Sequence, residues 1–139
     1  MFNRSLIARL LIGCVIFFNV QAAVFFLVNP DSYAPAFGLT GIPGKVMVQG
    51  MGILFLMWNV PYGVALWQPV RYRISLYEAI AMQAIGLAGE SLLLVSLPDG
   101  YWEIRETAAR FIQFDGVGFL ALVSAAWITR KTVLLPPKT

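Results

Sequence analysis

The chain has 139 residues, of which 59% are hydrophobic and only 12% are charged. Soluble domains carry about 25% charged residues, so this composition excludes an ordinary soluble globule and predicts one integral membrane domain over residues 1–139, with no nucleic-acid partner despite the net charge of +3. One cysteine, Cys14, and no histidine exclude an internal disulfide, a Cys/His zinc site and a serine–histidine triad.

Four apolar runs are long enough to cross a hydrocarbon core, which takes about 20 residues of helix. They cover roughly residues 6–28, 46–67, 75–97 and 111–129. Proline and glycine mark helix ends in the first and third connections. The sequence therefore predicts an all-α fold, a four-helix transmembrane bundle with short inner and longer outer connections.

The distribution of basic residues predicts the orientation, because Lys and Arg accumulate in cytoplasmic loops. With the N-terminus inside, the inner side receives Arg4, Arg9, Arg71, Arg73, Arg130, Lys131 and Lys138, and the outer side receives Lys45, Arg105 and Arg110. Both termini are therefore predicted to lie in the cytoplasm.

The outer connections carry features of their own. The first, NPDSYAPAFGLTGIPGK, places Phe37, Leu39 and Ile42 among turn formers. The last contains YWEIRETAAR, which can form a short interfacial helix with Glu106 and Arg110 as an i, i+4 pair. We expect both segments to act as lids over the outer end of the bundle.

Polar side chains inside the spans are costly in lipid and must face the bundle interior, a partner or water. Most of them fall in the outer half, namely Asn19, Gln21, Gln49, Glu90, Gln113 and Asp115. Gln83 lies near the centre of the third span and Asn59 past the middle of the second. The candidates for a polar pocket are Glu90, Asp115, Gln83, Gln49, Asn19 and Gln113.

Helical spacing places several of these residues on stripes together with small residues. The stripes are Ala79, Gln83, Gly86 and Glu90; Gln49, Gly52, Leu56, Asn59 and Gly63; and Asp115, Gly118, Leu122 and Ala125. Such stripes are typical of interfaces between membrane helices. The polar groups are therefore predicted to point inward.

Proline adds a local break in the second span. Pro61 cannot donate a hydrogen bond to the Met57 carbonyl, and it disfavours helix at Val60. We expect a kink or a freed carbonyl there, which membrane proteins tolerate where it lines a cavity or is satisfied by neighbours.

Two interpretations are open for Glu90. It can be structural, either protonated and bonded to other helices or paired with Arg110. It can equally mark a site or pathway, which is the usual role of an acid inside the membrane. For Asp115, which the sequence places closer to the surface, the structural interpretation is favoured.

The sequence resembles the DoxX-like group of small four-helix bacterial membrane proteins. The likeness lies in NP followed by FGLTGIP in the first loop, and in QGMGILFLMWNVPYGVALWQPVRYR, and it covers roughly residues 5–90. It implies a compact four-helix bundle, multi-pass in the inner membrane of a bacterium. Because the family includes a small subunit of a thiosulfate:quinone oxidoreductase, it also implies an association with quinone chemistry. No catalytic residue is carried over.

Three functions are compatible with these features. The favoured hypothesis is a non-enzymatic accessory or scaffold subunit of a larger membrane complex, such as a quinone-linked respiratory or photosynthetic assembly. Its expected partners are lipids and either other subunits or a second copy. The alternative is a binding protein or small transporter with an outer polar pocket centred on Glu90. An enzyme is disfavoured because no nucleophile–base pair, metal cluster or phosphate loop is present. No cofactor or metal is predicted, and a lipid or quinone is a possible ligand.

Overall fold

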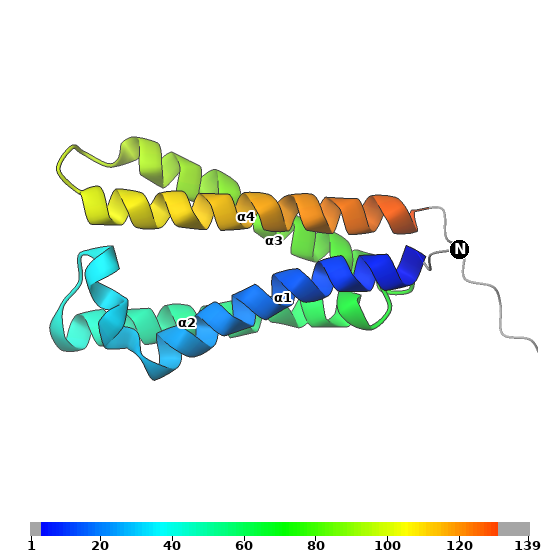
Figure 1. Ribbon diagram of the computed structural model, residues 1–139, viewed down its shortest axis with the longest axis horizontal. Helices are drawn as coiled ribbons and strands as arrows, with labels where there is room; N and C mark the ends of the chain where they lie inside the picture. Colours follow the sequence, from blue (N-terminus) through cyan, green and yellow to red (C-terminus); the bar gives the residue numbers. More distant parts are fainter. Residues whose placement is uncertain (1–3, 131–139) are drawn as a thin grey trace, which may run out of the picture.

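The computed structural model describes residues 4–130, and all regular elements in this part of the chain are helical. The long helices are α1 (Arg4–Val28), α2 (Gly41–Trp67), α3 (Arg73–Ser96) and α4 (Trp102–Thr129), with the short 3₁₀ helices η1 (Pro30–Ser32) and η2 (Ala34–Phe37) between the first two. The four long helices run alternately up and down, so both described ends of the chain lie at one end of the bundle (Figure 1). The predicted all-α, four-helix fold is confirmed.

Each long helix is long and apolar enough to cross a membrane, so the protein is a multi-pass membrane protein. The end that holds residues 29–40 and 97–101 is here called the outer end, following the predicted orientation. Of the basic residues that support this orientation, Lys131 and Lys138 lie outside the described residues.

Two helices extend further outward than the predicted spans. α2 begins at Gly41, and α4 begins at Trp102 rather than near residue 111. The segment 101–110, predicted as a separate interfacial helix, instead supplies the first turns of α4, because no proline or glycine interrupts the chain between Trp102 and Asp115. Arg110 donates to the backbone carbonyl of Glu106 rather than pairing with its carboxylate.

The predicted break at Pro61 does not interrupt the second helix. α2 stays helical from Gly41 to Trp67 with Pro61 inside it. Two residues before Pro61, the side chain of Asn59 donates from Nδ2 to the Phe55 carbonyl at 2.6 Å. The polar atoms at this level of α2 are therefore held by the helix itself as well as by its neighbours.

Two packed layers hold the four helices together. The inner core joins all four helices and contains four alanines among larger side chains: Ala8, Ile12, Val15, Tyr62, Ala65, Leu76, Ala79, Leu122 and Ala125. The aromatic cap joins α1, α2, α4 and the η1–η2 segment at the outer end: Tyr33, Phe26, Phe37, Phe55 and Phe111, with Ala34, Leu39, Val48 and Met51. Small side chains let membrane helices approach closely, whereas the cap fills a wider space with rings.

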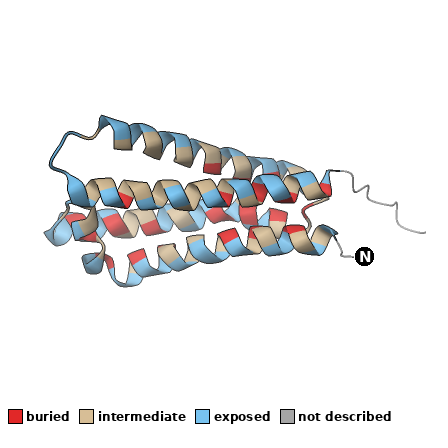
Figure 2. Cartoon of the chain, turned by 45° about the horizontal axis from the view of Figure 1, so that its top comes forward, coloured by how far each residue is buried: buried red, intermediate tan, exposed pale blue. Residues whose placement is uncertain are grey.

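The outside of the bundle is apolar as well. Figure 2 shows that buried positions follow the faces that the helices turn toward one another, whereas exposed positions cover the outside. The exposed positions include large apolar side chains such as Phe17, Val28 and Val95. Such a surface suits lipid contact, because the hydrocarbon core offers no water to solvate polar groups.

Helix α3 is the least enclosed of the four. Toward the outer end it diverges from α1 and α2 and stays beside α4 (Figure 1). Its buried residues, Leu76, Ala79 and Gln83, all lie in its inner half. The η1 and η2 segments contact α1, α2 and α4, but not α3. The outer half of α3 therefore packs mainly against α4.

Candidate functional site

A cavity of about 430 Å³ lies between the inner core and the aromatic cap, and all four long helices contribute to its wall. Its lining residues are Asn19 from α1; Phe55, Trp58, Asn59 and Tyr62 from α2; Met82, Gln83, Ile85, Gly86, Gly89, Glu90 and Leu93 from α3; and Phe111, Phe114 and Asp115 from α4. This size is in the range of pockets that hold small molecules.

The polar floor of the cavity is a chain of hydrogen bonds across three helices. Tyr62 donates from its hydroxyl to Oε1 of Gln83 at 2.7 Å. Gln83 in turn donates from Nε2 to Oδ1 of Asp115, also at 2.7 Å. A buried tyrosine hydroxyl and a buried amide both need partners in an apolar medium. The three side chains satisfy one another and fix the position of the Asp115 carboxylate.

Two glycines make room for these hydrogen-bonded side chains. A Cβ atom at Gly118 on α4 would lie 2.8 Å from Nε2 of Gln83. On α3, a Cβ atom at Gly86 would overlap Oδ2 of Asp115. Each helix thus presents a glycine to the polar side chain of the other, which brings α3 and α4 close at the level of the cavity.

Glu90 is the second carboxylate in the wall. Its Oε2 atom is buried and accepts no hydrogen bond from any described residue. Arg110, one of the alternatives that the sequence allows as its partner, instead donates to the Glu106 carbonyl and the Thr107 hydroxyl. The pairing of Glu90 with Arg110 that the sequence left open is therefore absent, and the Glu90 carboxyl group retains an unused acceptor beside the cavity.

An amide pair completes the polar part of the wall. Nδ2 of Asn19 on α1 lies 3.4 Å from Oδ1 of Asn59, as a long hydrogen bond. Because Asn59 also donates to the Phe55 carbonyl, its side chain is held in one orientation. The polar groups of α1 and α2 therefore face those of α3 and α4 across the same space.

The rest of the wall is rich in aromatic rings and contains no base. Five lining residues are aromatic: Phe55, Trp58, Tyr62, Phe111 and Phe114. Phe55 and Phe111 also belong to the aromatic cap, where their ring centroids lie 6.2 Å apart in an edge-to-face arrangement. None of the described lining residues is Lys or Arg. The formal charge of the wall is therefore carried by carboxyl groups alone.

The cavity is accessible from the side of the bundle. The inner core borders it on the inner side through Tyr62, and the aromatic cap borders it on the outer side through Phe55 and Phe111. Its α2 and α3 edges carry Trp58, Ile85 and Leu93, which are 49%, 72% and 64% exposed. In a membrane these residues face lipid, so the mouth between α2 and α3 opens into the bilayer.

Of the six predicted pocket residues, the structure brings four together at this cavity: Asn19, Gln83, Glu90 and Asp115. Asp115 lies near the middle of α4, and not near its outer end, because that helix begins at Trp102. Its place at the floor of the cavity removes the reason for preferring a purely structural role.

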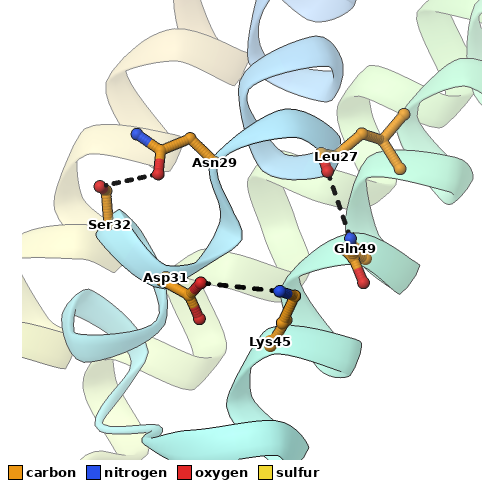
Figure 3. Close-up of polar contacts among 6 residues, drawn as sticks. All are labelled: Leu27, Asn29, Asp31, Ser32, Lys45 and Gln49. Atoms are coloured by element: carbon orange, nitrogen blue, oxygen red, sulfur yellow. Dashed lines mark hydrogen bonds and ion pairs between the residues drawn. The ribbon is translucent and has the colours of Figure 1, made fainter.

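The other two candidates lie elsewhere. Gln49 donates from Nε2 to the Leu27 carbonyl at 3.2 Å, and so ties α2 to the end of α1 (Figure 3). In the same view, Lys45 pairs with Asp31 at 3.8 Å on the outer surface. Gln113 is exposed on α4 and does not line the cavity. Gln21 is exposed on α1.

The sequence prediction missed Phe55 and Tyr62 because it chose a neighbouring face of α2. The predicted stripe ran through Gly52 and Asn59 but continued to Leu56 and Gly63, which are exposed. The buried face runs through the same two residues to Phe55 and Tyr62. The sequence does indicate the correct face at Tyr62, because a tyrosine away from the headgroup level needs a partner for its hydroxyl inside the bundle.

Within residues 4–130 the structure shows no group of three or more Asp, Glu or Cys side chains that could hold a metal ion. The site offers binding groups: acceptors, amides and rings. Comparison with known proteins adds no identity, since no family model, curated protein or solved structure matches the chain. The resemblance to DoxX-like proteins and the quinone association that it implies therefore stay predictions.

Proposed function

We propose that this protein is a small membrane-embedded binding protein that holds a lipophilic molecule with a polar group in the cavity between α2 and α3. The observation that carries the proposal is the cavity itself, which combines aromatic walls, a polar floor and the carboxyl group of Glu90, whose buried Oε2 has no hydrogen-bond partner among the described residues. An apolar pocket with a few fixed polar groups is the usual form of a small-molecule site.

Lateral access supports the same proposal. A molecule dissolved in the bilayer reaches the mouth beside Trp58, Ile85 and Leu93 without crossing the headgroup region. Its apolar part would contact the rings and its polar part the floor formed by Gln83 and Asp115. Quinones, lipids and lipophilic amines all have this two-part character.

The accessory-subunit hypothesis has less support from the described residues. It relies on the large apolar side chains on the outside, such as Phe17 and Val95. Lipid contact requires the same surface, so these residues do not point to a protein partner. A scaffold also has no need of a cavity that reaches the bundle centre. Binding is therefore the function that the geometry favours.

Glycines provide a sharp test. A Cβ at Gly89, on the cavity wall, and one at Gly63, outside the cavity on α2, both meet no atom within 4 Å. Gly89→Phe should therefore fill the mouth without a backbone clash. Gly63→Phe adds the same ring to a lipid-facing surface and serves as the matched control.

The probes are two tryptophan quenchers with the same ten-carbon tail, a neutral decyl benzoquinone and the cation N-decylpyridinium. In a chain with Trp67, Trp102 and Trp127 changed to Phe, Trp58 on the cavity wall becomes the reporter. In lipid nanodiscs we expect saturable quenching by at least one probe, retained in Gly63→Phe and replaced by linear, collisional quenching in Gly89→Phe. Linear quenching by both probes in the parent, or unchanged saturation in Gly89→Phe, would overturn the proposal.

A further inference from the structure

The charges of the cavity narrow the class of molecule that fits it. Glu90 on α3 and Asp115 on α4 face the same space, and the described lining residues include no Lys or Arg. The one basic side chain close to this level on α4, Arg110, is bonded to Glu106 and Thr107. Carboxyl groups inside a membrane are usually paired with a counter-charge. Here the described part of the chain supplies none.

The aromatic rings favour one type of counter-charge. Five aromatic residues line the same cavity as the two acids: Phe55, Trp58, Tyr62, Phe111 and Phe114. The face of an aromatic ring attracts a cation, and rings of this kind recognise quaternary ammonium groups. A bare metal ion requires several oxygen ligands at short distance, and no described group of three acidic or sulfur ligands is present. An organic cation needs only a carboxylate and rings.

The hydrogen bonds assign different roles to the two acids. Asp115 already accepts a bond from Gln83 at Oδ1, and its Oδ2 lies against the glycine at position 86. Glu90 retains a buried Oε2 without a partner and lies closer to the outer end of α3. Glu90, which lines the cavity without a hydrogen-bond partner for its Oε2, is therefore the acid placed to pair with a ligand, and Asp115 adds a second carboxyl group below it.

On the basis of the proposed binding function, we infer that the ligand is a lipophilic organic cation, an amine or quaternary ammonium group attached to an apolar body. It reaches the cavity from the bilayer, pairs its charge with Glu90 and places its apolar groups against the aromatic rings. The inference rests on charge complementarity, on the composition of the wall and on the position of the mouth.

The test uses two ions of nearly the same size and shape but opposite charge, tetraphenylphosphonium and tetraphenylborate. Each is added to the Trp58 reporter chain in nanodiscs of neutral lipid, in competition with N-decylpyridinium. We expect tetraphenylphosphonium to displace the pyridinium probe and tetraphenylborate to leave it bound. Glu90→Gln should lower the affinity for tetraphenylphosphonium on the order of 30-fold, because truncating one partner of a buried charge pair has effects of that order.

Controls separate this inference from the proposed function. Glu78→Gln removes one acid from the exposed face of α3, outside the cavity, and should leave the affinity unchanged. Asp115→Asn keeps an acceptor for Gln83. It should therefore lower the affinity for tetraphenylphosphonium without unfolding the bundle. Saturable quenching by the neutral quinone alone, or equal displacement by both tetraphenyl ions, would overturn the cation inference and leave the binding function standing. Linear quenching by every probe would overturn both.

Discussion

The carboxylate of Asp115 on α4 occupies the space on α3 that a side chain at Gly86 would need. The relationship is reciprocal, since Gln83 on α3 lies against Gly118 on α4. The pairing of these two helices is therefore matched residue by residue at the level of the cavity. This interlock also sets the distance at which Asp115 and Gln83 form their hydrogen bond.

The first prediction concerns Gly86. Gly86→Ala should displace the Asp115 carboxylate and destabilise the bundle by about 1–3 kcal/mol, the usual cost of overpacking a tight contact. Unfolding of the purified protein in mixed micelles measures this change. Gly50→Ala on α2 is the control, because a Cβ there meets no atom within 4 Å. Equal stability of the two variants would contradict the interlock.

The second prediction concerns the hydroxyl of Tyr62. Tyr62→Phe removes the bond to Oε1 of Gln83 and should cost about 0.6 kcal/mol and at most about 1.7 kcal/mol, the range measured for bonds between membrane helices. A double-mutant cycle with Gln83→Leu isolates the coupling between the two side chains. Tyr33→Phe, in the aromatic cap, is the control and should change stability little. A coupling energy indistinguishable from zero would argue against the hydrogen-bonded floor.

The third prediction concerns the link between the η2 segment and α4. The buried Thr107 hydroxyl lies 2.8 Å from both the Ala36 and the Glu103 carbonyls. Thr107→Val should lower the free energy of local opening of η2 by about 1 kcal/mol, which is the net contribution of a typical hydrogen bond. Hydrogen exchange at the amides of Gly38 and Leu39 should then become roughly fivefold faster, following that difference in free energy.

Thr129 offers the matched control for this experiment. It is also a buried threonine of α4, but its hydroxyl donates only to carbonyls of its own helix, those of Ala125 and Ala126. Thr129→Val should leave exchange in η2 unchanged. If Thr107→Val and Thr129→Val have the same effect on these amides, the hydroxyl does not tie the segment to α4.

The fourth prediction concerns orientation. A chain with Cys14→Ala has no thiol, so a single new cysteine reports its side of the membrane. We expect Asp99→Cys to react with an impermeant maleimide from outside intact cells, and Arg71→Cys to react only after the membrane is opened. The reason is the excess of basic residues on the side of Arg71. The opposite labelling pattern would reverse the predicted topology.

Much of the fold could be predicted from the sequence, because membrane spans depend on long apolar runs. The inward stripes of α3 and α4 were also accessible, since Gln83 and Gly86 on one helix and Asp115 and Gly118 on the other follow helical spacing. What the pattern could not supply was the fit between them. The contact of Asp115 with Gly86 depends on the relative height of two helices.

The face of α2 and the depth of Asp115 were harder to predict. In α2, the residues three and four positions from Gly52 lie on adjacent faces, and helical spacing alone allowed a stripe through Leu56 as well as one through Phe55. In α4, the charged segment before residue 111 looked like a boundary by composition. The helix nevertheless continues outward to Trp102, because backbone hydrogen bonding does not depend on hydropathy.

The position of the mouth between α2 and α3 affects how the occupancy of the cavity depends on the aqueous concentration of a ligand. A molecule that reaches this cavity through lipid is sampled at its concentration in the membrane. Apparent affinity referred to the aqueous phase is then the product of a partition coefficient and the intrinsic affinity of the site. A tenfold higher partition coefficient lowers the apparent aqueous Kd as much as about 1.4 kcal/mol of additional binding free energy would. A site with few specific contacts can therefore be filled at low aqueous concentration. Selectivity among equally lipophilic molecules then depends on the polar atoms of the cavity floor.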